Sequence, residues 1–437
     1  MDTERPVNLR SLAYWLVDGL KGGVVRRHCR DLEAISRMSP FEQRRTSESR
    51  AREMAAFAIR NVPFYAGLDP ATSFERMPVV NKSVMREDIG RFIASGRSTA
   101  DMRKAMTSGS TGTPFVVYQD RDKRARMEAD TIYWGAQAGY GMGEVLFYLR
   151  IWTKALTKGA IYPYLTNIWP VDVSLQTPEE LEAILRRMLA CRGRYSLLGY
   201  VSSLEALCQH VEATGPRSFP NPPRGILTMS ESLDGGLRNR LLRQFGVWPV
   251  SRYSNIENGL VAQQPRGPED YFVLNHGSFH VEVLSEASDQ PVKEGEAGRI
   301  VVTDLFNKGM PFVRYDTGDI GAFSKDKEGR LVIGRVEGRR MDQISDARGR
   351  PVSPLVVNNQ MLAFPEMRQY QFIQRAHGDY LVKVNLPGGF ARTQELIAMF
   401  KSLLGEDAQV AVEMVEEIPV LNSGKRKKVV NLMERQS

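Results

Sequence analysis

Apolar positions recur at helical spacing through the first hundred residues of the chain. The longest example is SPFEQRRTSESRAREMAAFAIRNV (39–62), in which apolar positions three and four residues apart are separated by charged residues. This pattern predicts a mainly helical start over residues 1 to about 100. From about residue 105 onward, short apolar runs alternate with helical stretches, which favours a layered α/β arrangement.

The clearest single helix is predicted at TPEELEAILRRML (177–189). Thr177 is a suitable N-cap, Glu180 completes a capping box with it, and Pro178 suits the first turn. One face of this helix is apolar and is expected to be core; it comprises Leu181, Ile184, Leu185 and Met188.

Strands are predicted where β-rich runs are bounded by polar or glycine-containing turns. They are FVVYQD (115–120), HVEVL (280–284), RIVVTDL (299–305) and PFVRYDT (311–317). Near the C-terminus, QYQFIQ, DYLVKVNL, a helix near 392–404 and AQVAVEMV predict a compact β-β-α-β unit.

These patterns predict an α/β protein with two domains and a hinge. A large N-terminal domain of layered sheets and helices spans 1–337, and a small mobile α+β C-terminal domain spans 351–437. The charged stretch VEGRRMDQISDARGR lacks long apolar runs and predicts the hinge, placed at 338–350. There is no internal repeat and no low-complexity tract.

Composition narrows the class of protein. The chain has 437 residues, of which 42% are hydrophobic and 25% charged, as in globular domains. LAYWLVDGL (12–20) is short and contains Asp18, so we expect neither a signal peptide nor a membrane anchor. The three cysteines of the chain are far apart and form no C-x-x-C pair. This favours a reducing cytoplasm over a disulfide framework or a zinc site.

The net charge of +8 suits anionic small ligands, and the same balance would suit nucleic acid. The basic residues are spread along the chain apart from KRKK at 425–428. A nucleic-acid binder is therefore disfavoured, because no basic stripe with interleaved aromatic residues is present.

Residues 107–115, TSGSTGTPF, are typical of a loop that surrounds phosphate oxygens. Glycines let backbone N–H groups approach an anion, and hydroxyls add donors or complete a Mg²⁺ shell. The G-K-[ST] ending of the P-loop is missing, and a strand rather than a helix is predicted to follow. The loop contains no cation, and a flexible turn is the alternative.

Two acidic motifs follow in the chain. In YSNIENG (253–259), Glu257 is a candidate Mg²⁺ ligand, because a hard cation prefers oxygen. In RYDTGD (314–319), Asp319 is a candidate acceptor for ribose hydroxyls. An ordinary polar turn is the alternative for the first motif, and a turn-capping aspartate for the second.

The motif LNSGKRKKV (421–429) supplies a candidate cation. Lys425 follows Ser423-Gly424, a turn that can present its ammonium to a phosphate. A solvated basic tail is the alternative.

Singly these motifs are weak, but their order is specific. TSGSTGTP, Y-x-x-x-E, R-Y-x-T-G-D, G-R-x-x-D and S-G-K in a small C-terminal domain resemble the adenylate-forming superfamily of acyl-CoA ligases. NVPFYAGL (61–68), LLGYVSSLEAL (197–207) and GEAGRIVVTDL followed by PFVRYDTGD resemble the branch that contains phenylacetate–CoA ligase, CapK proteins and coenzyme F390 synthetase. The resemblance spans roughly residues 50 to 430.

The resemblance implies an ATP-dependent, AMP-forming acid–CoA ligase with a small carboxylic acid as substrate, perhaps aryl. Such enzymes use ATP·Mg²⁺ to form an acyl-adenylate and pyrophosphate, and then usually transfer the acyl group to coenzyme A. Positioning and charge stabilisation dominate this chemistry, so no Ser/His pair is needed.

The resemblance also implies roles for individual residues. The β- and γ-phosphates would lie in the loop Thr107, Ser108, Gly109, Ser110, Thr111, Gly112 and Thr113. The adenine segment would contain Ser230, Glu231 and Ser232, and Tyr253 would flank the base. Glu257 would ligate Mg²⁺, Asp319 would hold the ribose, and Arg339 would reach the nucleotide from the domain junction. The implied catalytic residues are Lys425, Glu257 and Thr111.

Two positions depart from the family pattern. Many relatives place a lysine directly after the loop proline, where this chain has Phe115, so the cation for adenylation would be Lys425 of the small domain. The family swings that domain between an adenylation pose and a thioester pose, in which Gly349 would line the pantetheine channel. The usual hinge Asp or Lys is replaced by Met341, next to Asp342.

Several alternatives stay open at this point. The acyl acceptor is an amine, a sugar or a carrier protein in a CapK-like variant, and AMP itself is transferred in an F390 synthetase-like variant. A non-catalytic nucleotide-binding or scaffold protein is the rival from another class; Glu257, Asp319 and Lys425 together argue against it. The resemblance also allows a homodimer.

Overall fold

The computed structural model describes most of the chain. The described residues are 8–106, 115–152, 166–174, 176–231, 233, 235–337, 344–352, 356–357, 360–364, 366–367, 369–386, 388–418 and 428–433. Structural statements below refer to these residues.

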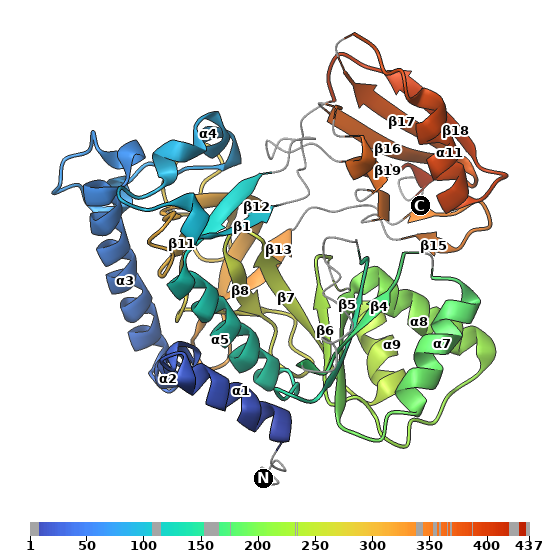
Figure 1. Ribbon diagram of the computed structural model, residues 1–437, viewed down its shortest axis with the longest axis horizontal. Helices are drawn as coiled ribbons and strands as arrows, with labels where there is room; N and C mark the ends of the chain where they lie inside the picture. The colour runs from blue at the N-terminus through green and yellow to red at the C-terminus, as the bar shows by residue number, and fades with distance from the viewer. Residues whose placement is uncertain are drawn as a thin grey trace.

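The N-terminal hundred residues are mainly helical, as the periodicity predicts. The α-helices are α1 (Leu9–Leu20), α2 (Val24–Ser36), α3 (Pro40–Asn61) and α4 (Lys82–Glu87); the 3-10 helices are η1 (Pro63–Tyr65), η2 (Phe74–Arg76), η3 (Ile89–Phe92) and η4 (Thr99–Asp101). Ser39 and Glu42 form a capping box at the start of α3, with Pro40 in its first turn. Helix α3 flanks one side of the molecule (Figure 1).

The main sheet has eleven strands in the order β10-β11-β12-β13-β9-β8-β7-β6-β5-β3-β4. Its parallel part contains β3 (Val145–Arg150), β4 (Ile168–Asp172), β5 (Tyr195–Tyr200), β6 (Ile226–Met229) and β7 (Pro249–Asn255). Its antiparallel part continues through β8 (Gly259–Gln263), β9 (Phe272–Leu274), β10 (Phe279–Leu284), β11 (Ala297–Asp304), β12 (Tyr315–Lys325) and β13 (Leu331–Glu337). The change from parallel to antiparallel pairing occurs at β7.

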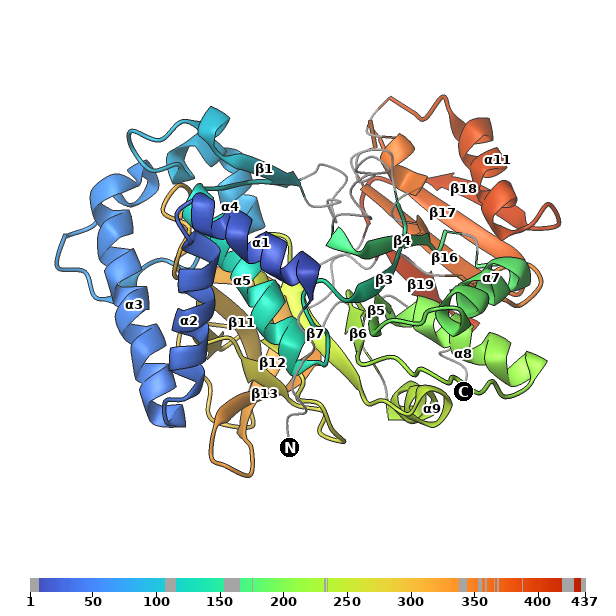
Figure 2. The ribbon, with the colours of Figure 1, turned by 60° about the horizontal axis from the view of Figure 1, so that its bottom comes forward.

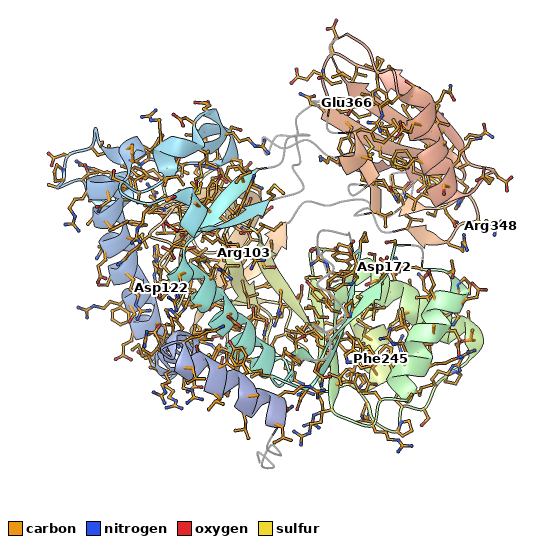
Figure 3. The ribbon with its side chains drawn as sticks, in the orientation of Figure 1. Arg103, Asp122, Asp172, Phe245, Arg348 and Glu366 are labelled. Atoms are coloured by element: carbon orange, nitrogen blue, oxygen red, sulfur yellow. The ribbon has the colours of Figure 1, made fainter. Side chains whose placement is uncertain are left out.

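Helices cover the parallel part of this sheet. They are α7 (Pro178–Leu189), α8 (Val201–Thr214) and α9 (Gly235–Phe245), and their apolar faces share one core with β3 and β5. Phe245 lies among the packed side chains of this layer (Figure 3). The predicted helix α7 is confirmed, with Thr177 and Glu180 in a capping box and with the predicted apolar face buried.

Helix α5 (Arg121–Gln137) crosses between the N-terminal helices and the antiparallel strands (Figure 2). It follows a short antiparallel hairpin of β1 (Arg103–Met106) and β2 (Val116–Gln119). The predicted strand at 115–120 is therefore confirmed, and the two strands flank residues 107–114 in the sequence.

One predicted strand is wrong in its first half. Residues 311–314 are not part of a strand, and β12 begins only at Tyr315. Arg314 has a φ of 46°, in the left-handed region, because its backbone and guanidinium serve tertiary contacts. Its guanidinium donates to the carbonyl oxygens of Glu75 (2.7 Å) and Met77 (2.9 Å) and pairs with Glu282.

A parallel bridge joins the N-terminal segment to the main sheet beside this arginine. Val80 pairs with Tyr315: the Val80 amide donates to the Arg314 carbonyl (3.1 Å), and the Asp316 amide donates to the Val80 carbonyl (2.8 Å). Residues 80–82, which lead into α4, are therefore fixed next to β12.

The C-terminal part forms a separate four-stranded sheet in the order β18-β17-β16-β19 (Figure 1). Its elements are β14 (Ile344–Ser345), β15 (Pro351–Val352), η5 (Met361–Ala363), β16 (Gln369–Ala376), β17 (Asp379–Asn385), α11 (Thr393–Leu404), β18 (Gln409–Met414) and β19 (Val429–Asn431). The predicted β-β-α-β order is confirmed, and β19, parallel to β16, is an additional strand. This sheet and α11 share a core of their own around Phe372 and Phe400. The exact domain boundaries and the hinge stay predictions, since 338–343 lie outside the described residues.

Candidate functional site

Glu257 lies in the tight turn between β7 and β8 and is 2% exposed. The Lys82 ammonium, at the first residue of α4, is 2.5 Å from its Oε1. The Tyr315 hydroxyl donates to the same oxygen at 3.2 Å. A buried carboxylate of this kind is stable only with such partners, because desolvation of an isolated charge is costly.

The turn that carries Glu257 is fixed from behind by a buried cation. The Lys123 ammonium of α5 donates to the Asn258 carbonyl (2.6 Å) and lies 2.5 Å from Asp304 Oδ2, with both side chains fully buried. Asp304 Oδ1 accepts hydrogen bonds from the amides of Phe306 and Asn307. Gln119 of β2 also donates to the Ile256 carbonyl at 3.3 Å. The position of Glu257 is therefore set by α5 and β2 as well as by its own strands.

Asp319 of β12 meets Tyr253 of β7. The Tyr253 hydroxyl is 3.0 Å from Asp319 Oδ2 and 3.2 Å from Thr317 Oγ1, and the Asp319 amide donates to Thr317 Oγ1 at 3.1 Å. Burial, with the nearby Asp319 charge, raises the pKa of Tyr253 well above its usual value, so this hydroxyl stays a donor at neutral pH. The structure thus brings these two predicted residues into direct contact.

Two hydrogen bonds cross between the same pair of segments. Tyr253 of β7 contacts Asp319 of β12, and Tyr315 of β12 contacts Glu257 of the β7–β8 turn. Three of the predicted residues, Tyr253, Glu257 and Asp319, therefore take part in two separate polar contacts that join β7 and its following turn to β12.

Ser230 and Glu231 follow β6 at the carboxyl edge of the parallel strands. Ser230 has a φ of 69°, in the left-handed region. The Glu231 carboxylate accepts from the Ser202 amide (2.6 Å) and hydroxyl (3.0 Å) in the first turn of α8, where a negative charge is favourable. Their predicted contact with adenine stays a prediction; Glu231 is engaged with α8.

Gly349 lies in the turn between β14 and β15 with a φ of +77°, and a Cβ there would meet no atom within 4 Å. Asp346 holds this turn, because its Oδ1 accepts from the amides of Arg348 and Arg350, both at 2.9 Å. A cavity of about 290 Å³ lies beside it, against the start of α7, and Lys401 also lines it. The role of Gly349 in a pantetheine channel stays a prediction.

The remaining predicted site residues lie outside the described residues. They are Thr107, Ser108, Gly109, Ser110, Thr111, Gly112, Thr113, Ser232, Arg339 and Lys425, together with the hinge positions Met341 and Asp342. Phe115, which stands where many relatives have a lysine, is 1% exposed and packs with Val80, Met85 and Phe312.

Sequence reasoning missed Lys82. Its partner Glu257 is distant in the chain, and such a contact leaves no periodic signal. One local signal was available: Asn81 caps α4 through the amides of Ser83 and Val84, which places Lys82 at the positive end of the helix dipole. A lysine at this unfavourable position is explained by the carboxylate that it meets.

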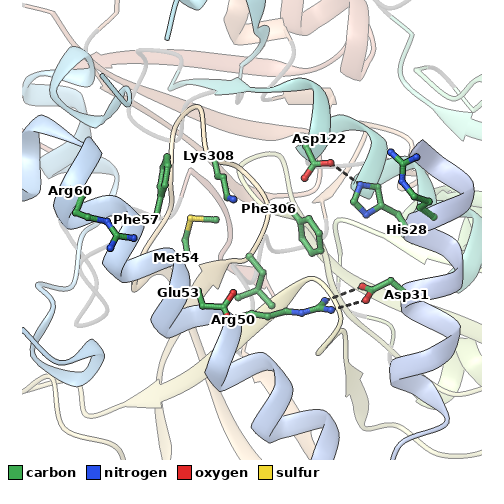
Figure 4. Close-up of a pocket in the computed structure, with 12 residues that line it drawn as sticks. His28, Asp31, Arg50, Glu53, Met54, Phe57, Arg60, Asp122, Phe306 and Lys308 are labelled. Carbon is green, nitrogen blue, oxygen red and sulfur yellow. Dashed lines mark hydrogen bonds and ion pairs between the residues drawn. The ribbon is translucent and has the colours of Figure 1, made fainter. Parts of the chain in front are cut away.

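A second, larger cavity lies elsewhere, between α2, α3 and residues 305–308 (Figure 4). Its volume is about 560 Å³, and none of the predicted site residues lines it. Two ion pairs lie in its lining: Arg50 pairs with Asp31 at 2.6 Å, and His28 with Asp122 at 3.0 Å. Within the described ranges, no group of three or more His, Cys, Asp or Glu side chains is arranged to hold a metal ion.

Comparison with known proteins relates this geometry to a family. Residues 344–432 match the family model of the CapK C-terminal domain. A phenylacetate–coenzyme A ligase of Thermus thermophilus is 26% identical over 385 residues, which cover 77% of this chain and 79% of that protein.

Solved structures of 2-hydroxyisobutyryl-CoA ligase share the fold. The structure with 2-HIB-AMP and CoA in the thioesterification state has a TM-score of 0.61, with 18% identity over 91% of this chain and 92% of that one. The postadenylation structure with 2-HIB-AMP has a TM-score of 0.57, with 18% identity over 91% of each chain.

The C-terminal residues therefore match the CapK C-terminal domain, and most of the chain is similar to phenylacetate–CoA ligase. The fold is shared with a solved acyl-CoA ligase of the adenylate-forming kind.

Proposed function

We propose that this protein is an ATP-dependent, AMP-forming acid–CoA ligase. The observation that carries the proposal is the pair of hydrogen bonds, Tyr253 to Asp319 and Tyr315 to Glu257, by which β7 and the turn after it meet β12. Asp319 is the carboxylate expected to bind the nucleotide, and Glu257 is a second, buried carboxylate. Both lie on a fold that is shared with a CoA ligase. The relatives named phenylacetate–coenzyme A ligase support the same activity.

The reaction has two steps under this proposal. An oxygen of the substrate carboxylate attacks the α-phosphorus of ATP; that bond forms as the bond to the bridging oxygen breaks, and pyrophosphate leaves. The CoA thiol then loses its proton and attacks the acyl carbon, and AMP leaves with the electrons of the broken acyl–oxygen bond. Neither step needs a protein nucleophile, so binding geometry and charge dominate.

Asp319 would accept hydrogen bonds from the ribose hydroxyls, and Tyr253 would orient its carboxylate for that contact. Ser230, Glu231 and Ser232 would border the adenine. Residues 107–113, including Thr111, would receive the β- and γ-phosphates, since β1 and β2 flank them in the sequence. The Lys425 ammonium of the C-terminal domain would balance negative charge on the phosphates.

Glu257 fits the role of a Mg²⁺ ligand. It is a hard oxygen donor, is 2% exposed, and already holds a cation, the Lys82 ammonium, at 2.5 Å. The bound ion would supply neutralisation of the charge on the phosphates. Lys123 keeps the turn of Glu257 in place through the Asn258 carbonyl.

Two domain poses belong to the same proposal. Arg339 would reach the nucleotide at the junction in the first pose, and Gly349 would line the thiol channel in the second. Residues 344–432 match the CapK C-terminal domain, so the first alternative is transfer of the acyl group to an amine, a sugar or a carrier protein. The second alternative is transfer of AMP itself to a hydroxyl group. A cytoplasmic location, with access to ATP and CoA, and a homodimer remain expectations of this proposal.

The test measures pyrophosphate release from ATP and Mg²⁺ with a panel of aryl, fatty and amino acids, with and without CoA. We expect release with one class of acid and a loss on the order of 100-fold or more in Glu257→Gln and Lys425→Ala. Lys427→Ala, two residues along the same basic run, is the matched control and should retain activity.

CoA-dependent AMP formation identifies the acceptor. Turnover that needs an amine, a sugar or a carrier protein in place of CoA would support the CapK-like alternative. Absence of acid-dependent pyrophosphate release across the panel, with ATP still bound, would contradict the proposed ligase activity.

A further inference from the structure

Helix α1 presents an apolar face away from the rest of the protein. Its exposed apolar side chains are Leu9 (79% exposed), Leu12 (54%), Leu16 (67%), Val17 (46%) and Leu20 (82%). At 100° per residue these positions share one side of the helix. The opposite side carries Tyr14, Trp15 and Asp18. A surface helix usually turns its apolar side chains toward the protein, whereas α1 turns most of them toward solvent.

Polar contacts hold this orientation. The Asp18 carboxylate, 7% exposed, accepts from the amides of Val25 (3.1 Å) and Arg26 (3.0 Å) and so caps α2. Asn8 caps α1 through the amides of Arg10 and Ser11. Tyr14 packs toward α5, where Glu128 is its hydrogen-bond partner. Rotation of α1 to bury its leucines would break these contacts, so their exposure is built into the fold.

Cations gather where α1 meets α2. Lys21 directly follows α1, the Arg27 guanidinium donates to the Gly22 carbonyl (2.7 Å), and the Arg26 guanidinium lies 5.1 Å from the centre of the Trp15 ring. All three are exposed, whereas Asp18, the carboxylate within α1, is turned inward. We name Lys21, Arg26 and Arg27 the basic corner. An apolar face beside it is complementary to a surface with an apolar interior and negative headgroups.

We propose that α1 docks the protein reversibly on an anionic lipid bilayer, with its apolar face inserted among the acyl chains and the basic corner at the headgroups. This inference is independent of the proposed ligase activity. The structure places α1 on the outside of the molecule, beside α2 (Figures 1 and 2).

A second copy of the chain fits this face less well. Helix α1 has 12 residues and is about 18 Å long. One short convex helix buries much less than the ~800 Å² per partner of a stable interface. A fluid bilayer can surround such a ridge of side chains, and a rigid protein would need a matching groove.

The mode of attachment is peripheral. Over the described residues, no helix combines the length and apolarity needed to cross a membrane. The sequence predicted no membrane anchor at residues 12–20, and the proposed peripheral contact of α1 departs from that prediction. A helix lying in the plane of the bilayer needs only one apolar face.

The experiment is co-sedimentation of the full chain with vesicles of phosphatidylcholine alone and of phosphatidylcholine mixed with phosphatidylglycerol, at low and high salt. We expect binding to the anionic vesicles that weakens with salt. Leu12→Gln/Leu16→Gln should lower the partition coefficient by on the order of 100-fold. Lys21→Gln/Arg27→Gln should lower binding to the anionic vesicles selectively.

Met414→Gln, at an apolar side chain 45% exposed on β18, is the matched control and should bind like the wild type. Thermal unfolding of each variant checks that the fold is intact. Two results would overturn the proposal. One is a wild-type protein that stays in the supernatant with both kinds of vesicle. The other is a dimer in light scattering that Leu12→Gln/Leu16→Gln converts to monomer, since a second copy would then cover the face.

Discussion

The Tyr253 hydroxyl lies 3.0 Å from the Asp319 carboxylate, and the proposed function gives it the task of orienting that carboxylate. Removing it in Tyr253→Phe leaves the ring buried and takes one hydrogen bond from the carboxylate, worth about 1.5–3 kcal/mol for a charged acceptor. We expect KM for ATP to rise roughly tenfold or more, with kcat changed much less. Steady-state pyrophosphate release checks this, and an unchanged KM would contradict the orienting role.

Residue chemistry could be predicted only in part. Glu257, Asp319 and Tyr253 could be singled out because each belongs to a short motif in fixed order, and the structure places Tyr253 on Asp319 and Tyr315 on Glu257. Lys82 could not be found from a motif, since its importance arises from a long-range contact. The roles of Lys425, Arg339 and residues 107–113 stay predictions.

At the scale of elements, the β7–β8 turn depends on α5 through Lys123. Lys123→Met would leave Asp304 buried without its cation and the Asn258 carbonyl without its donor. We expect a loss of about 3–5 kcal/mol in the free energy of unfolding, measured with urea. The double variant Lys123→Met/Asp304→Asn should recover part of this loss, because the uncompensated charge is gone. No recovery would argue against the buried pair as the cause.

Helix α3 meets two buried imidazoles, His276 in the turn before β10 and His280 in β10. Ser47 contacts Nδ1 of both His276 and His280 at 3.3 Å. Burial lowers the pKa of His276 to about 3 and that of His280 to about 4. The unfolded chain protonates these groups below about pH 6.5, whereas the folded chain does not.

Stability should therefore fall as the pH drops below about 6.5, by about 1.4 kcal/mol per pH unit for each imidazole, and level off near the folded pKa values. Urea unfolding at about pH 7 and about pH 5 checks this. His276→Gln should show a shallower loss between the two pH values, by the contribution of one imidazole. Equal slopes would indicate that His276 is protonated in the folded state.

Elements whose signals are local were predicted well. Thr177, Glu180 and the apolar face of α7 lie within one short stretch, and the structure reproduces all of them. The start of β12 was predicted too early, because Arg314 leaves the extended conformation to meet Glu75, Met77 and Glu282. Strand β19 was not predicted, because it has only three residues and is defined by its pairing with β16.

At the scale of the whole molecule, the proposed function assigns Gly349 of the C-terminal part to the second half-reaction. Gly349→Leu would place a side chain in the open space beside the β14–β15 turn, at a φ of +77°. We expect acyl-CoA formation to fall by at least about tenfold, because the thiol path is narrowed. Acid-dependent exchange of pyrophosphate into ATP should change by less than about twofold. Equal losses in both assays would indicate damage to the fold.

The overall architecture was predictable because order along the chain is informative: helices first, then alternating elements, then a small β-β-α-β unit. The pairing of distant strands into one sheet of eleven was not predictable from periodicity. The bridge between Val80 and Tyr315 depends on the same long-range assembly.

That bridge has a consequence for how mutational scans of this protein should be interpreted. Arg314 and Glu282 touch no proposed substrate group, but they tie the segment before Val80 to the sheet, and Lys82 follows two residues later. A substitution at either position would displace Lys82 from Glu257 and register as a loss of turnover. A scan scored on activity alone would therefore count two structural residues as part of the catalytic apparatus.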